Sequence, residues 1–295
     1  MTLDEMIVSL DSIKGQEAQL MDYTITSYSS NEITKVRAYA FYSCSKLTSI
    51  DLPSATSVGV GAFSGCSILE NVNIPNTTSL GGSAFSGCSK LTSVSFPNVQ
   101  STGSSTFYNC QSLSSIDLPV VTSFNDSAFE NCKALVEVDF PMAKSFVFST
   151  FKNCTALRKV SLPSAGSFST GVFSGCTSLT DIYIPNVKSI GSSFGNCSSL
   201  ARIDLPSVTS LSNASFSGCT ALETMILRKE LESGVVSVPS NLTGTKIAAG
   251  EGYFYVPRSM YDRYMSNTSW AKYSAQIRII EDYPDICDPQ PAEGG

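Results

Sequence analysis

The chain repeats one pattern of apolar and polar residues nine times, with a cysteine always in the same place. A Phe precedes each cysteine by three residues, a Leu follows it by three, and apolar residues follow it by six and eight. The step between cysteines is 22 residues, except for 21 residues between the seventh and the eighth. The nine are Cys44, Cys66, Cys88, Cys110, Cys132, Cys154, Cys176, Cys197 and Cys219.

Each repeat predicts three short elements. The stretch L-x-x-h-x-h, where h is apolar, is too short for a helix and alternates at its end like a strand. A proline follows it in eight of the nine units and ends the strand, with Arg228 as the exception. A Ser-apolar pair predicts a second, very short strand. The stretch A-F-x-G/N-C predicts a tight helical turn, because Gly and Asn readily accept positive φ.

A single unit of this length cannot bury its apolar face, whereas stacked units bury it in continuous columns. At a strand spacing of about 4.8 Å, about ten stacked strands give a curved slab roughly 45 Å long. We therefore expect a β-rich repeat solenoid, a right-handed coil with a concave parallel sheet and with short strands and helical turns on the convex side.

The repeat resembles the BspA-type leucine-rich repeat, a bacterial subtype that carries L-x-x-I-x-L-P and A-F-x-x-C in each unit. The resemblance extends over roughly residues 25–257. It implies the curved leucine-rich repeat solenoid. It also implies a microbial surface or secreted protein, because members of this family are linked to adhesion to host proteins and other cells.

The N-terminal end is expected to carry a helical cap over residues 1–24. Thr2 and Glu5 form a capping-box pattern, and apolar residues that share one helical face predict an amphipathic helix over residues 2–13. A degenerate repeat unit follows before Cys44. The helix face contains Leu3, Met6, Ile7 and Leu10, and the degenerate unit contains Ile25, Ile33 and Val36.

A degenerate repeat, which we call the worn repeat, is visible at the C-terminal end. Residues 241–245 align with A-F-S-G-C, and residues 253–257 align with the strand and its proline, so the solenoid is expected to span residues 25–257. A helix–turn–helix with buried aromatic residues then predicts a cap over residues 258–286, although a separate carbohydrate or protein site is an alternative. Residues 287–295 are expected to form a disordered tail or the start of a linker.

The composition of the chain narrows the range of functions that it can have. A net charge of −6 and a pI of about 4.8 argue against binding to nucleic acid or to anionic membranes, and no apolar run approaches the ~20 residues that span a bilayer. The absence of histidine excludes Ser-His-Asp and Cys-His mechanisms and His metal sites. Since the N-terminus does not read as a signal peptide, we expect either a trimmed exported precursor or export by another route.

The repeated cysteines are interpreted as buried, reduced, structural thiols. Their spacing would suit disulfides, but parallel Cβ vectors oppose the geometry of the bond. Zinc or iron–sulfur binding is disfavoured because no C-x-x-C pair occurs, and no cofactor or metal is expected. Cys287 lies outside the repeat and is a candidate free or intermolecular thiol.

Variable positions on the concave strands suggest a binding site. The residues at these positions are small and polar in the first coils, that is, in the N-terminal turns of the solenoid, and become charged from Glu137 onward. Tyr and Arg are favoured in binding sites. A solvated face without a partner and a calcium site are the alternatives. The candidate ligand-binding patch contains Glu137, Asp139, Lys159, Asp181, Tyr183, Arg202 and Asp204.

These observations favour a non-enzymatic binding module that acts in surface adhesion or receptor recognition. The expected partner is a protein or glycan on a host or bacterial surface, and the expected location is extracellular, at a cell surface or in a virion. The alternative is a structural or receptor-binding component of a phage tail or another extracellular assembly. The oligomeric state stays open.

Overall fold

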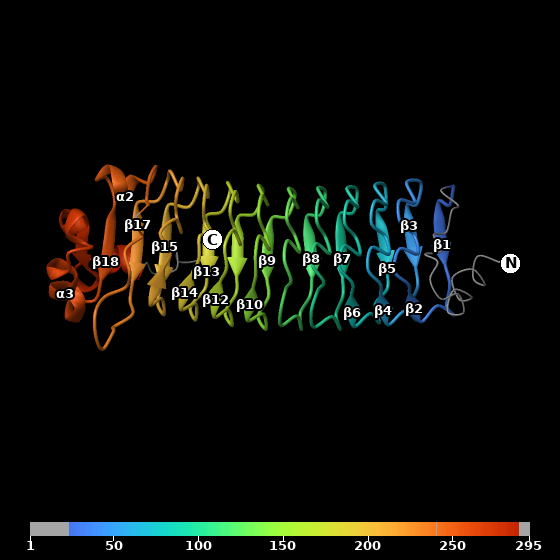
Figure 1. Ribbon diagram of the computed structural model, residues 1–295, viewed down its shortest axis with the longest axis horizontal. Helices are drawn as coiled ribbons and strands as arrows, with labels where there is room; N and C mark the ends of the chain where they lie inside the picture. The colour runs from blue at the N-terminus through green and yellow to red at the C-terminus, as the bar shows by residue number, and fades with distance from the viewer. Residues whose placement is uncertain (1–23, 240, 289–295) are drawn as a thin grey trace.

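The computed structural model describes residues 24–239 and 241–288. Its coils stack side by side along one long axis, from β1 at one end to α3 at the other (Figure 1). The predicted β-solenoid is confirmed, because its strands pair in parallel from coil to coil. The helix expected over residues 2–13 and the end of the expected tail, residues 289–295, lie outside the described residues.

One strand of every coil contributes to a parallel sheet, whose outer side we call the sheet face. Partners are one repeat apart, as in Ser27↔Ser49 and Lys159↔Asp181. The ladder is interrupted between β5 and β7, between β8 and β9, and between β13 and β15. The strands are β1 (Ser27–Ser29), β3 (Ser49–Asp51), β5 (Asn71–Asn73), β7 (Ser93–Ser95), β8 (Ser115–Asp117), β9 (Glu137–Asp139), β11 (Lys159–Ser161), β13 (Asp181–Tyr183), β15 (Arg202–Leu205) and β17 (Thr224–Leu227).

The Ser-apolar pairs form the second row of short strands. Where Thr102 replaces the apolar residue, isolated bridges form in place of a strand, from Leu80 to Thr102 and from Ser101 to Ser123. The Thr102 hydroxyl is buried without a hydrogen-bond partner among the described residues. The strands are β2 (Lys35–Val36), β4 (Ser57–Val58), β6 (Ser79–Leu80), β10 (Ser145–Phe146), β12 (Ser167–Phe168), β14 (Ser189–Ile190) and β16 (Ser210–Leu211).

The turn before each cysteine uses the left-handed backbone region. The residue just before the cysteine has positive φ, as predicted, for example 78° at Gly65 and 60° at Asn109. A second left-handed residue four positions earlier, such as Ser83 or Ser127, was not predicted. The residue missing from the 21-residue step falls in this turn, between Ile190 and Phe194. The strands on either side of it keep their register, with Ser189 opposite Ser210.

Aromatic rings run through the core in one stack. The nine repeat phenylalanines, from Phe41 to Phe216, stack with ring centroids 5.1–5.5 Å apart and planes within 13° of each other. The repeat cysteines and leucines are also fully buried beside them. The predicted columns are therefore confirmed.

Both ends extend the solenoid. β1 and β2 belong to the predicted degenerate unit, where Ile33 and Val36 are buried. At the other end β18 pairs with β17, as the worn repeat predicted, and β19 adds a strand that was not predicted. The elements are α2 (Lys246–Ala249), β18 (Tyr253–Val256), η2 (Arg258–Met260), α3 (Tyr261–Ser266), η3 (Ala271–Gln276), β19 (Ile277–Ile279), η4 (Ile280–Asp282) and α4 (Pro284–Cys287).

Aromatic side chains close the C-terminal end. Trp270 and Tyr264 are buried, and the Trp270 ring meets Phe254 edge-on at a centroid distance of 4.8 Å. The Trp270 indole nitrogen donates a hydrogen bond to the Val236 carbonyl. These contacts cover the last coil with buried aromatic side chains. Within the described chain, no helix has the length and apolar character needed to span a membrane.

Candidate functional site

Five residues of the predicted patch lie together on β9, β11 and β13. In the strand register, Lys159 lies between Glu137 and Asp181, so a positive side chain stands between two negative ones. Asp139 and Tyr183 lie on either side of Ser161 in the next row. All five predicted side chains are exposed, and Tyr183 keeps 58% of its surface open to solvent.

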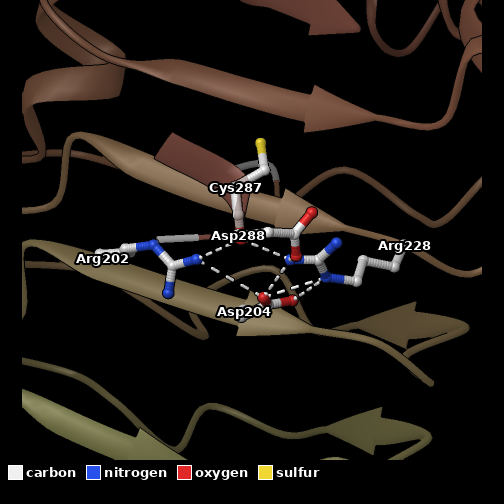
Figure 2. A network of polar contacts seen from close by, with 5 residues as sticks. All are labelled: Arg202, Asp204, Arg228, Cys287 and Asp288. Atoms are coloured by element: carbon white, nitrogen blue, oxygen red, sulfur yellow. Dashed lines mark hydrogen bonds and ion pairs between the residues drawn. The ribbon is translucent and has the colours of Figure 1, made fainter. Parts of the chain in front are cut away.

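Arg202 and Asp204 are placed differently, because the C-terminal segment of the chain lies against them (Figure 2). The Arg202 Nη2 atom donates a hydrogen bond of 2.9 Å to the Cys287 carbonyl oxygen. Asp204 accepts hydrogen bonds of 2.8–3.0 Å from Nε and Nη2 of Arg228 through both of its oxygens. These two residues therefore form part of an internal contact rather than an open surface.

Arg228 joins the C-terminal segment to Asp204. It occupies the repeat position at which the other eight repeats have proline. Its Nη2 atom also donates to the Cys287 carbonyl oxygen at 2.6 Å and to Asp288 Oδ1 at 2.8 Å. The hydrogen bonds to Asp204 raise the pKa of Arg228 above its ordinary value, although partial burial acts in the opposite direction. The guanidinium thus stays charged and holds the C-terminal segment on the sheet face.

Cys287 is an unpaired, buried thiol at the end of α4. It packs with Ile226 and Tyr255 in a small apolar cluster, and burial raises the pKa of its thiol. Cys287 and Asp288, which the sequence analysis placed in the tail, therefore contact the folded cap and the sheet face.

A hollow on the sheet face lies where the parallel ladder is interrupted between β8 and β9. Ile116 in its floor is only half-buried, whereas Val138 at the same repeat position in the next coil is buried. Asp117 occupies the same repeat position as Asp139 but was not among the residues predicted for the patch. The hollow is lined by Ser115, Ile116, Asp117, Pro119, Glu137, Val138, Asp139, Pro141, Lys159 and Ser161.

The predicted burial of the repeat cysteines is confirmed, and these residues have a role that the sequence did not reveal. Each thiol from Cys66 to Cys219 donates a hydrogen bond of 2.9–3.2 Å to a Phe carbonyl oxygen of the preceding coil. Burial raises the pKa of Cys66 and of Cys110 to about 12, so these thiols stay protonated and unreactive near neutral pH. Among the described residues, no group of three or more His, Cys, Asp or Glu side chains is arranged to hold a metal ion.

Solved structures with a similar arrangement include three bacterial leucine-rich repeat proteins. A leucine-rich repeat protein from Bacteroides ovatus has 20% identity and a TM-score of 0.39, with 87% of this chain and 84% of that chain covered. The leucine-rich repeat protein of T. pallidum has 21% identity and a TM-score of 0.42, with coverage of 67% and 78%. A leucine-rich cell surface protein from Faecalibacterium prausnitzii has 20% identity and a TM-score of 0.36, with coverage of 92% and 81%.

A comparison with curated proteins found no match. The profile of the BspA type leucine-rich repeat region, in contrast, matches residues 34–158 and 144–247 with six copies of the repeat. The matched segments include most of the stacked coils. The match agrees with the repeat length, the buried columns and the parallel sheet described above. The chain therefore belongs to the BspA-type leucine-rich repeat family.

Proposed function

We propose that this protein is a non-enzymatic binding module that recognises a protein or glycan on a host or bacterial surface through its sheet face. Leucine-rich repeat proteins typically act as protein-binding or surface modules, which supports the proposal. The observation that carries it is the exposed Tyr183, which shares β13 with Asp181, opposite β11 with Lys159. A tyrosine supplies a large contact area at a small entropic cost, because few torsions are fixed on binding.

The binding surface in this proposal differs from the seven-residue patch. It keeps the exposed residues of β9, β11 and β13, and it gains Asp117 from the hollow. Arg202 and Asp204 are left out because Arg202 Nη2 is bonded to the Cys287 carbonyl oxygen and the Asp204 carboxylate is bonded to Arg228. The remaining residues lie on short strands that are hydrogen-bonded to neighbouring strands, so their side chains project from a rigid sheet.

We also propose that the protein acts outside the cell, at a cell surface or in the extracellular space, in adhesion. The Ser, Thr and Asn residues that fill much of the remaining sheet face are compatible with a solvated surface around a small contact area.

A binding screen tests the proposal. The purified chain is applied to immobilised fibronectin, fibrinogen and collagen and to a glycan array, and affinities are measured by surface plasmon resonance. We expect Tyr183→Ala to weaken binding by about tenfold or more, since central tyrosines often contribute over 1 kcal/mol. Tyr108→Ala is the matched control, because Tyr108 is exposed in a turn rather than on the sheet face. Unchanged affinity of a folded Tyr183→Ala protein would exclude the surface.

A further inference from the structure

We propose that the hollow between β8, β9 and β11 receives an arginine side chain from a basic segment of a partner protein. The proposal rests on the function proposed above and names the chemistry of the partner. Its evidence consists of the charge of the hollow, a guanidinium already bound at an equivalent position, and an apolar floor.

The hollow carries an excess of negative charge. Asp117, Glu137 and Asp139 supply three carboxylates against the single ammonium group of Lys159. Lys159 is itself flanked in register by Glu137 and by Asp181, so its charge is offset from both sides. Opposite charge on a partner would therefore be attracted to this surface, and like charge would be repelled.

The chain itself shows how an aspartate at this repeat position binds a guanidinium. Asp204, like Asp117 and Asp139, lies seven residues after its cysteine. It accepts hydrogen bonds from both Nε and Nη2 of Arg228, whose side chain reaches it from the adjacent coil along the sheet face (Figure 2). An aspartate carboxylate at this position is thus oriented so that an arginine lying over the sheet face can bind to both of its oxygens.

The carboxylates in the hollow remain available for the same interaction. Among the described residues, Asp139 has no ion-pair or hydrogen-bond partner for its side chain, and Asp117 accepts one hydrogen bond of 2.7 Å, from the Ser95 hydroxyl. Asp51, at the same repeat position near the N-terminal end, is instead bonded to Asn73 at 2.7 Å and to Ser29 at 3.3 Å. Among these aspartates, Asp139 therefore keeps both carboxylate oxygens free, whereas Asp51 is bonded to neutral side chains and Asp204 to Arg228.

The floor of the hollow suits the rest of an arginine side chain. At the interrupted ladder, Ile116 is half-buried next to Asp117 and lines the hollow. An arginine buries its methylene groups on apolar surface while its guanidinium stays with the carboxylates. Lysine fits less well, because its ammonium group cannot make the paired hydrogen bonds that a guanidinium makes.

Synthetic peptides test this inference directly. The probe is a fluorescein-labelled peptide in which Gly-Ser-Arg is repeated four times, and matched peptides replace Arg by Lys, citrulline or Glu. Binding to the full chain is followed by fluorescence anisotropy. We expect the arginine peptide to bind, the lysine peptide to bind less tightly, and the citrulline and glutamate peptides not to bind. Raising the salt concentration should weaken the interaction, since the charges are solvent-exposed.

Two Asp-to-Asn variants show where on the protein the arginine peptide binds. Asp139→Asn should weaken binding of the arginine peptide by about tenfold, which corresponds to the loss of one charge-assisted contact. Asp51→Asn is the matched control and should leave the affinity unchanged, because the Asp51 carboxylate is already bonded internally. Both positions are exposed, so both variants should fold, and circular dichroism checks this.

The possible outcomes separate the two proposals. Equal binding of the citrulline and arginine peptides, or equal affinity of the wild-type and Asp139→Asn proteins, overturns the arginine site. If no peptide binds but a protein or glycan in the screen depends on Tyr183, the arginine site is wrong and the binding module remains. If neither peptides nor the screen show binding, both proposals fail.

Discussion

The Sγ atom of Cys132 donates a hydrogen bond of 3.1 Å to the carbonyl oxygen of Phe107, in the preceding coil. The same carbonyl already accepts the Cys110 main-chain N–H at 3.2 Å. The thiol therefore satisfies a second lone pair that would otherwise be buried between two coils. Each repeat cysteine from Cys66 onward both fills space in the core and joins its coil to the one before.

Cys132→Ala should lower the free energy of unfolding by about 1–2 kcal/mol, because it removes this donor and opens a small cavity. Urea denaturation followed by circular dichroism measures the change. Ser115→Ala, which alters an exposed residue of similar size, should stay within about 0.5 kcal/mol of the wild type. Equal stability of Cys132→Ala and the wild type would show that the thiol contributes nothing measurable.

Phe129→Ala should cost about 3–5 kcal/mol, because the ring is fully buried and its loss leaves a cavity in the middle of the stack. The Phe129 ring lies 5.3 Å from the rings of both Phe107 and Phe151. Phe148→Ala makes the same chemical change at a side chain that is 57% exposed, and it should cost less than about 1 kcal/mol. A loss below about 1 kcal/mol for Phe129→Ala would contradict the importance of the stack.

Stability should fall as the pH rises above 9. Burial raises the pKa of Cys110 from its ordinary value of 9.0 to about 12. Between these values the unfolded chain loses the thiol proton while the folded chain keeps it, so the unfolded state binds fewer protons and is favoured. Urea midpoints at pH 7, 9 and 10.5 measure this loss. The free energy of unfolding of the Cys110→Ala variant should fall less steeply with pH than that of the wild type. The two slopes should differ by up to about 1.4 kcal/mol per pH unit. Parallel pH profiles of the two proteins would contradict this assignment.

Arg228→Ala should release the C-terminal segment from the sheet face. The variant removes the hydrogen bonds to Asp204, the Cys287 carbonyl and Asp288, so we expect faster hydrogen–deuterium exchange in residues 284–288. A double-mutant cycle with Asp204→Ala should give a coupling of about 1–2 kcal/mol for this charged, partly buried pair. Lys229→Ala, at the exposed neighbouring position, should change neither result. Unaltered exchange in Arg228→Ala would mean that Arg228 does not hold the segment.

Most of the solenoid could be predicted because its determinants recur at fixed spacing. The residues before the cysteines, such as Gly65 and Asn109, indicate the turn through their tolerance of positive φ. The worn unit at residues 241–257 keeps enough of the pattern for β18 to be expected. In each case the prediction depends on residues within one repeat length.

The site was harder to predict because its determinants are not periodic. The contact between Arg202 and Cys287 joins residues 85 positions apart, and nothing in the repeat indicates that the chain returns to the sheet face. The ladder is also interrupted between β8 and β9, beside the half-buried Ile116, and this interruption does not follow the period of the repeat. The sequence placed the charged residues at equivalent positions of the strands but could not show which of them already had partners inside the molecule.

The residue missing between Ile190 and Phe194 has a consequence for how such a surface can evolve. The deletion is absorbed in the turn, while Ser189 still pairs with Ser210 and Phe173 still stacks on Phe194 at 5.3 Å. Insertions and deletions on that side therefore leave the opposite side in place. Natural selection can vary the outward residues of one coil, or duplicate a whole coil in frame, without disturbing the packing of the other coils.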